Sequence, residues 1–261
     1  MDVVPQKDVA GVDLGPSLRN ESTGLLIAHR KANARSWIIE IHRQHRLHLE
    51  RDRKNQHRCN TILAEQCRGC SVIVVDAPLF LESLKEWEQA LIGCPGLTDA
   101  MKPSPTSAIL SHAWRAKDLI RDCEAINPAL ETYEIFPAAW FWLGDFDRDV
   151  EWKGDAAARP NKIVWFDTTV KRLRAQGIEI DMHKSNLSAD EADALPCVAC
   201  AILAAESRTM LRLDGTQPPV LFPPKDLWDA GLPQSVKNLA WCDWSHARHD
   251  KADKQRAVVA N

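Results

Sequence analysis

The sequence predicts an α/β fold, in which helices flank a mixed sheet of five strands. Two features of the chain carry this prediction. Short apolar segments rich in β-branched residues recur through the first half of the chain, and longer segments of helix-forming residues lie between and after them. The 261 residues are enough for one sizeable domain. The chain shows no internal repeat and no clear second domain.

Five apolar segments have the length and composition of strands, and they occupy residues 9–15, 24–28, 37–41, 71–76 and 131–136. The links between the first three are short, which favours antiparallel pairing. The fourth consists almost wholly of β-branched residues, so we expect it in the centre of the sheet. Pro78 and Pro137 cannot donate a backbone hydrogen bond and mark the ends of the last two.

Helices are expected at residues 44–67, in pieces over 79–127, at 161–176 and at 188–207. Ser188 and Glu191 have the spacing of a capping box, which predicts where the last helix begins. Pro196 leaves two alternatives for that helix. It either kinks or breaks the helix from inside, or it lies in the first turn of a helix that begins near Asp193. The second alternative would leave Asp190 in a loop.

The domain is expected to span residues 9–215, with a helical insertion near 79–127. A polar leader at 1–8 precedes it, and an extension at 216–261, proline-rich and then charged, follows it. No apolar stretch approaches the roughly 20 residues that cross a membrane. The leader is too short and too polar for a signal peptide, so we expect a cytoplasmic protein.

Two cysteine pairs have C-x-x-C spacing, Cys67/Cys70 and Cys197/Cys200, and such pairs can hold zinc in principle. The second pair belongs to an apolar segment at 197–203 that has the composition of a buried helix. Small buried thiols are therefore the favoured interpretation.

Four aspartates mark a candidate site. Asp13 and Asp76 each end a predicted strand, and Asp190 and Asp193 lie about one turn apart at the start of the last helix. Clustered carboxylate oxygens are the ligands that Mg²⁺ and Mn²⁺ prefer, and such a cluster can hold two ions about 4 Å apart. Glu134, near the end of the fifth strand, is a further candidate as an outer ligand. Each residue also has a structural alternative, as a turn former, a cap or a partner of the helix dipole.

Five short motifs follow one another along the chain, and they are Gly-Val-Asp at 11–13, Val-Val-Asp-Ala-Pro-Leu at 74–79, Glu-Ile-Phe-Pro-Ala-Ala at 134–139, Asp-Ala at 193–194 and Cys-Ala at 200–201. Lys162 and the pattern at 173–177 accompany them. Together they resemble a large family of predicted nucleases of the ribonuclease H-like fold (domain of unknown function 429). The segment 190–195 is similar, more distantly, to the last active-site helix of RuvC-type Holliday-junction resolvases.

The resemblance spans residues 9–208 and has four implications. It implies the ribonuclease H-like fold and a nuclease activity, with phosphodiester hydrolysis at a site that holds Mg²⁺ or Mn²⁺. It also implies nucleic acid, DNA or RNA, as the partner. The aspartates named above are the catalytic and metal-binding residues that it indicates.

Two other functions stay open. Residues 13–17 (Asp-Leu-Gly-Pro-Ser) resemble the first phosphate loop of actin-like kinases and ATPases, although no second glycine-rich phosphate loop follows in the sequence. The other alternative is a member of the fold without catalysis, acting as a nucleic-acid-binding or assembly module.

Residues 29–58 form a basic strip. They carry nine Lys and Arg against three Asp and Glu, whereas the whole chain has a net charge of −3. A basic strip on an acidic body suits the phosphate backbone of nucleic acid. A solvated helix face is the alternative. The candidate phosphate contacts are Arg43, Arg46, Arg53 and Arg58.

Replacing these four arginines together by alanine is expected to weaken the binding of a labelled oligonucleotide of any sequence, because phosphate contacts carry affinity and not base identity. The slope of log affinity against log salt should fall by about one unit per lost contact. Fluorescence anisotropy across a salt series measures both quantities. Curves identical to those of the wild type would assign the strip to a solvated helix face.

Overall fold

A computed structural model describes residues 8–14, 23–31, 35–42, 53–76, 106–145, 158–183, 186–213 and 220–245 of the chain. Its main sheet has seven strands in the order β6-β3-β2-β1-β4-β5-β8. The strands are β1 Asp8–Leu14, β2 Thr23–Arg30, β3 Ser36–Ile41, β4 Cys70–Asp76, β5 Glu131–Ile135, β6 Glu179–Met182 and β8 Val220–Leu221. Strand β2 is antiparallel to both of its neighbours, and all other pairs are parallel. The α/β class and the mixed sheet are thus confirmed.

The predicted number of five strands is wrong, because two short strands extend the edges of the sheet. Strand β6 pairs with β3 over four residue pairs, and β8 pairs with β5 over two. Segments of four and two residues carry too little periodicity to be recognised in a sequence. Each is fixed by pairing with a strand that is distant along the chain.

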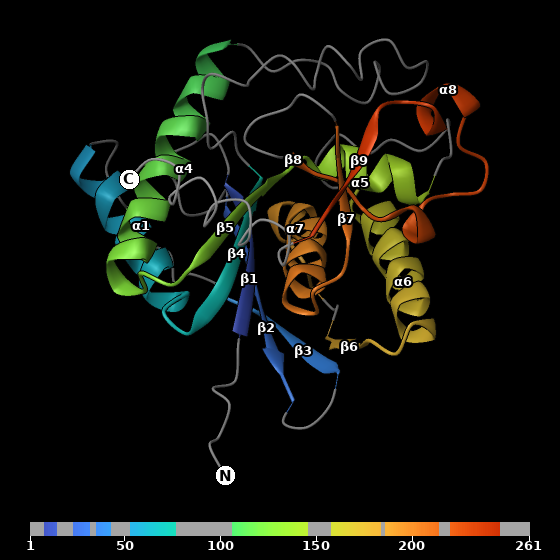
Figure 1. The fold of residues 1–261 in the computed structure, drawn as a ribbon. Helices are drawn as coiled ribbons and strands as arrows, with labels where there is room; N and C mark the ends of the chain where they lie inside the picture. The colour runs from blue at the N-terminus through green and yellow to red at the C-terminus, as the bar shows by residue number, and fades with distance from the viewer. Residues whose placement is uncertain are drawn as a thin grey trace, which may run out of the picture.

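Helices cover both faces of the sheet, and they are α1 Arg53–Gln66, α4 Thr106–Ile126, α5 Pro137–Gly144, α6 Arg159–Ala175 and α7 Ala189–Ala205. Helices α1 and α4 lie on one face, and α5, α6 and α7 lie on the other (Figure 1). None of the helices in the described ranges is long and apolar enough to cross a membrane.

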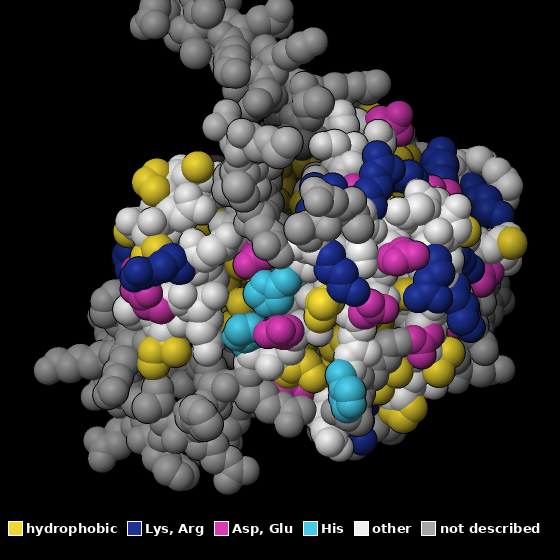
Figure 2. All heavy atoms as spheres, turned by 90° about the horizontal axis from the view of Figure 1, so that it is seen from below, with side chains coloured by type: hydrophobic (Ala, Val, Ile, Leu, Met, Phe, Trp, Pro, Cys, Tyr) yellow, Lys and Arg dark blue, Asp and Glu magenta, His cyan; other side chains and the backbone are white. Residues whose placement is uncertain are grey.

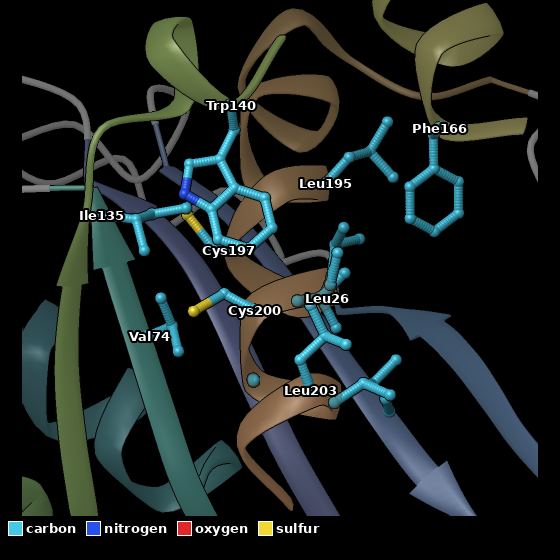
Figure 3. Close-up of a cluster of buried hydrophobic side chains, with 14 of the residues drawn as sticks. Leu26, Val74, Ile135, Trp140, Phe166, Leu195, Cys197, Cys200 and Leu203 are labelled. Atoms are coloured by element: carbon cyan, nitrogen blue, oxygen red, sulfur yellow. The ribbon is translucent and has the colours of Figure 1, made fainter. Parts of the chain in front are cut away.

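Helix α7 is the centre of the larger core. Its segment from Ala192 to Ala204 is buried almost throughout and packs on β1, β2 and β4. Figure 3 shows Leu195, Cys197, Cys200 and Leu203 on this helix beside Leu26 and Val74 of the sheet. A helix that is apolar on most sides fits only between other elements. Here α5 and α6 cover the side of α7 that faces away from the sheet.

Two glycines let α7 approach the sheet. A Cβ atom on Gly11 of β1 would lie 2.2 Å from the backbone nitrogen of Val198. A Cβ on Gly24 of β2 would lie 2.2 Å from the carbonyl oxygen of Asp190. Backbone atoms cannot move aside in the way that the end of a flexible side chain can. The absence of a side chain at Gly11 and Gly24 therefore sets how closely α7 lies on β1 and β2.

The capping box that begins α7 is confirmed. The Ser188 hydroxyl accepts from the Glu191 backbone at 3.1 Å, and the Ser188 backbone donates to the Glu191 carboxylate at 2.7 Å. Pro196 lies inside a helix that runs from Ala189, so the alternative start near Asp193 is wrong. Asp190 is helical. The reciprocal bonds at the cap stabilise the first turn, although Pro196 removes the donor to the carbonyl of Ala192.

Helix α5 was not expected. Pro137 ends β5, as predicted, and also begins a helix, because its fixed φ suits the first helical position. Trp140 and Phe141 are fully buried, and the Trp140 indole donates to the carbonyl of Leu221 at 2.8 Å. Trp140 and Phe141 thus pack in the larger core, as large aromatic side chains commonly do.

Residues 220–245 pack on the edge of the sheet. After β8 come the 3-10 turn η3 Lys225–Leu227, the short helix α8 Gln234–Lys237 and strand β9 Trp241–Trp244. Strand β9 pairs with β7 Met210–Leu213 in a second, two-stranded sheet. The described part of the expected extension after residue 215 therefore continues the fold. Of the expected leader at 1–8 only Asp8 is described, and it begins β1. Of the expected insertion near 79–127, residues 79–105 lie outside the described residues, and α4 forms most of the rest.

Gly11→Ala is expected to lower the free energy of unfolding by about 1–3 kcal/mol or more, because the methyl group meets the backbone of α7. Denaturant unfolding followed by circular dichroism measures the change. Gly69→Ala is the matched control, since a Cβ there meets only the Asp8 Oδ2 atom, at 3.6 Å. Equal stability of the two variants would contradict the close packing of α7 on β1.

Candidate functional site

Asp13 and Asp76 lie side by side at the ends of two neighbouring strands. They are paired in the parallel register of β1 and β4. Alternate residues of a strand share a face, so Asp13 projects on the same face as Gly11, which is the face that α7 covers. Only 9% of Asp13 is exposed. The sheet thus presents two adjacent carboxylates to the underside of α7.

Helix α7 supplies two more carboxylates from above. Its first turn lies over Gly24, and Gly24 pairs with Asp13 in the register of β1 and β2. The capping box fixes Glu191 to the helix start, so Glu191 has the structural role expected of it. Asp190 and Asp193, three residues apart, project from one side of the helix. The chain therefore brings Asp190 and Asp193 to the ends of β1 and β4.

Lys162 of α6 completes the cluster. Its side chain is only 2% exposed, and its ammonium lies 2.5 Å from the Asp193 carboxylate. It also lies over the Phe141 ring, 5.8 Å from the centroid. A buried lysine is rare unless it is paired, and this one provides a positive charge among four acidic side chains. We define Asp13, Asp76, Asp190, Asp193 and Lys162 as the aspartate cluster.

Within the aspartate cluster, burial and like charges act against the ionised form of Asp13. Burial raises the pKa of Asp13 well above its ordinary value, and Asp76, Asp193 and Asp190 raise it further, while Lys162 opposes them. Burial likewise raises the pKa of Asp193 against the effect of Lys162. Four carboxylates and one ammonium sum to a formal charge of −3 when all are ionised. Such perturbed, clustered groups are typical of functional sites.

Cys197 lies beneath this cluster. Burial raises the pKa of its thiol well above the ordinary value, and the neighbouring Asp76 and Asp13 carboxylates raise it further. The thiol is therefore protonated and packs as a small apolar group. It forms part of the floor of the cluster and provides no charge.

Glu134 is not brought to the aspartate cluster. It pairs with Val75 in the register of β4 and β5, so its side chain lies on the face opposite to that of Asp76. Val75 belongs to the core beneath α1 and α4. The expected role of Glu134 as an outer ligand therefore has no geometric support. A sequence cannot reveal this, because the face depends on the register of two distant strands.

The basic strip can be placed only in part. Arg43 and Arg46 lie outside the described residues, and Arg53 and Arg58 belong to the part of α1 whose side chains are not described. Their contacts to phosphate stay a prediction.

The two C-x-x-C pairs cannot share a zinc ion. Cys67 and Cys70 belong to the core under α1 and α4, whereas Cys197 and Cys200 belong to the core on the other face of the sheet. All four are buried free thiols, and burial contributes to raising the pKa of Cys67, Cys197 and Cys200 well above the ordinary value. The favoured interpretation as buried thiols thus agrees with the geometry.

One group of three side chains in the described part of the chain has all its ligand atoms within 4.8 Å of one another, and it consists of His29, Glu40 and His42. No three described carboxylates of the aspartate cluster meet this criterion. The two groups lie on opposite faces of the sheet, because His29 and Glu40 share a face with Ile27 of the α1/α4 core.

Sequence reasoning missed the place of Lys162 in the site and the whole His29–Glu40–His42 group. Lysines on helices are usually solvated, so nothing in the sequence predicts a buried Lys162. Its burial results from the contact of α6 with α5 and α7. The histidine group spans two strands, so it can be recognised only when their register is known.

Comparison with protein-family models, with curated proteins and with solved structures finds no match for this chain.

Asp13→Asn is expected to gain thermal stability relative to the wild type as the pH rises, in metal-free protein. A carboxyl group whose folded pKa is raised stabilises the fold below its unfolded pKa, and this stabilisation is lost as the pH rises through the folded pKa. Asparagine does not ionise, so the variant escapes the loss. The difference in Tm between the two proteins should therefore grow from acid to neutral pH.

Scanning calorimetry in the presence of a chelator, at a series of pH values, measures this difference. Asp226→Asn is the control, since Asp226 forms an exposed ion pair with Arg208 at 2.9 Å and exposed pairs contribute little. A Tm difference between Asp13→Asn and the wild type that does not change with pH would contradict the electrostatic cost of the aspartate cluster.

Proposed function

We propose that the protein is a metal-dependent phosphodiester hydrolase, a nuclease of the ribonuclease H-like fold, in which the aspartate cluster holds Mg²⁺ or Mn²⁺. One observation carries the proposal. Asp13 is buried at the end of a central strand with three other carboxylates acting on it and one lysine opposing them. Repulsion among buried carboxylates is typical of functional sites, and binding of a divalent cation would relieve it.

The topology supports the proposed fold family. The five central strands have the order β3-β2-β1-β4-β5, with β2 alone antiparallel. Helix α7 crosses the same strands that carry Asp13 and Asp76. Strands β6 and β8 extend this arrangement at its two edges. The order agrees with the resemblance of the sequence motifs to the predicted-nuclease family, and membership of that family is part of the proposal.

The ligand atoms favour a hard cation. All four acidic groups offer oxygen, which suits Mg²⁺ and Mn²⁺ rather than metals that prefer nitrogen or sulfur. The described side chains of the cluster sum to a formal charge of −3, so two divalent ions would bring this group to +1, which would attract a phosphodiester.

The residues of the cluster have separate tasks. Asp13 and Asp76, on rigid central strands, would hold a metal from the sheet side, and Asp190 and Asp193 from the helix side. Bound ions would activate a water molecule and stabilise the leaving oxygen. Lys162 holds Asp193 in position through its ion pair. Its buried ammonium also provides positive charge toward the scissile phosphate, as lysine does at other phosphate sites. The close packing of α7 on the sheet accompanies an exposure of only 9% at Asp13.

One observation favours the non-catalytic alternative. Lys162 already neutralises Asp193, and a cluster in which the lysine substitutes for a metal would stabilise the fold without catalysing hydrolysis. A metal-binding measurement distinguishes the two functions. In a non-catalytic cluster, the ion pair between Lys162 and Asp193 would persist in excess Mg²⁺. The actin-like alternative gains no support, since residues 15–17 of its loop at 13–17 lie outside the described residues.

Chelator-treated protein is expected to cleave nucleic acid only after Mg²⁺ or Mn²⁺ is added. Labelled single-stranded, duplex and branched DNA and single-stranded RNA identify the substrate class by gel analysis. Asp13→Asn and Asp76→Asn should each lower the rate by more than the roughly 10–100-fold typical of losing an outer-shell partner, because each removes a direct ligand. The amide keeps the size of the side chain, so folding should be retained.

Asp226→Asn, purified in the same way, is the control and should cleave at the wild-type rate. Equal rates for Asp13→Asn and the wild type would assign the activity to a contaminant. Absence of divalent-dependent cleavage with every substrate, together with absence of Mn²⁺ binding by calorimetry, would contradict the proposed function.

A further inference from the structure

A second group of chemistry-bearing side chains lies on the opposite face of the sheet from the aspartate cluster. His29 pairs with Ile38 and Glu40 pairs with Ile27 in the antiparallel register of β2 and β3. Since side chains alternate along a strand, His29, Glu40 and His42 project from one face. Figure 2 shows histidine and acidic side chains next to one another on the surface of the molecule. His29 and His42 are half-buried and Glu40 is exposed.

The distances within this group suit a shared metal ion better than hydrogen bonds. The Glu40 Oε2 atom lies 3.7 Å from His29 Nε2 and 3.9 Å from His42 Nε2. Both distances exceed hydrogen-bond length. Ligand atoms of a tetrahedral zinc ion lie about 3.4 Å apart, given metal–ligand bonds of about 2.0–2.1 Å. A small inward movement of the exposed Glu40 side chain would complete that geometry.

Asp8 prepares His29 for this role. The Asp8 Oδ2 atom lies 3.0 Å from His29 Nδ1. A carboxylate at this nitrogen holds the ring proton there, so that the lone pair of Nε2 is directed toward Glu40. The same carboxylate–histidine arrangement orients the ligands of many zinc sites. Asp8 therefore acts as a positioning residue and not as a ligand.

His42 provides the independent observation. Its Nε2 atom is buried and has no hydrogen-bond partner in the described part of the structure. An unsatisfied buried nitrogen lowers the stability of the fold. Neither His29 nor Glu40 forms a hydrogen bond with this nitrogen. A metal ion bonded to Nε2 would satisfy it.

We propose that His29, Glu40 and His42 bind a transition-metal ion, with Zn²⁺ as the preferred ion, and that Asp8 orients His29. Two imidazole nitrogens and one carboxylate form the donor set, and three protein ligands leave a fourth position for water or a ligand. The nitrogen donors separate this site from the all-oxygen aspartate cluster, which selects hard cations. Glu40 also lines a shallow depression of about 800 Å³ at the ends of β3 and β6. A small ligand therefore has space beside Glu40, the one proposed ligand that lines this depression.

Calorimetric titration of the chelator-treated full chain with Zn²⁺ tests the proposal. One equivalent should bind to the wild type when excess Mg²⁺ is present to occupy the aspartate cluster. His42→Ala and Glu40→Gln should each weaken this binding by at least a hundredfold, and Asp8→Asn by about 10–100-fold, as expected for an outer partner. Glu40→Gln keeps the shape of an exposed side chain, so it tests the ligand without threatening the fold. Circular dichroism verifies that each variant is folded.

Two controls separate this site from other zinc binding. Glu65→Gln alters an exposed carboxylate outside the group, and Asp13→Asn alters the aspartate cluster. Both variants should bind Zn²⁺ as the wild type does, so the outcome does not depend on the proposed nuclease function. X-ray absorption of the zinc-loaded protein should show nitrogen and oxygen ligands at about 2.0–2.1 Å with imidazole scattering. A sulfur shell at about 2.3 Å, or unchanged affinity in His42→Ala and Glu40→Gln, would overturn the proposal.

Discussion

The close approach of α7 to β1 and β2 is the constraint on which the rest of the structure depends. Gly11 and Gly24 leave no side chain between the strands and the helix backbone, so α7 lies directly on the sheet and buries the larger core. The same approach brings the first turn of α7 over the ends of β1 and β4. The packing that stabilises the domain is therefore also what positions the carboxylates of Asp190 and Asp193 above those of Asp13 and Asp76.

This arrangement lowers the stability of the fold, because it buries a charged cluster. Burial and three neighbouring carboxylates raise the pKa of Asp13, and the Lys162 ammonium offsets only part of the repulsion. Placing the carboxylates on central strands and on a capped helix prevents them from moving apart. A rigid cluster with excess negative charge is preorganised for divalent cations, because the repulsion has already been overcome by the packing of α7. The two faces of the sheet then offer different donors, oxygen beneath α7 and imidazole nitrogen at His29 and His42.

Local signals in the sequence predicted much of this fold. The capping box fixed the start of α7, and short apolar runs identified the five central strands, so the four aspartates could be expected at one end of the sheet. Features that depend on register could not be predicted. Glu134 lies on the other face because it pairs with Val75, and His29 meets Glu40 only through the pairing of β2 with β3. The burial of Lys162 depends on how α5, α6 and α7 pack against one another, which no local pattern in the sequence shows. Strands β6 and β8 were too short to recognise.

A crystal structure with saturating Mn²⁺, analysed by anomalous scattering, tests the central claim most directly. The claim is that the aspartate cluster binds hard cations. We expect manganese density between the strand ends and α7, with carboxylate oxygens of Asp13, Asp76 and Asp193 within the roughly 2.0–2.6 Å typical of hard cations. Absence of manganese from the cluster, with Lys162 still paired to Asp193, would contradict the claim. The buried charge would then be neutralised by the lysine and by protons alone.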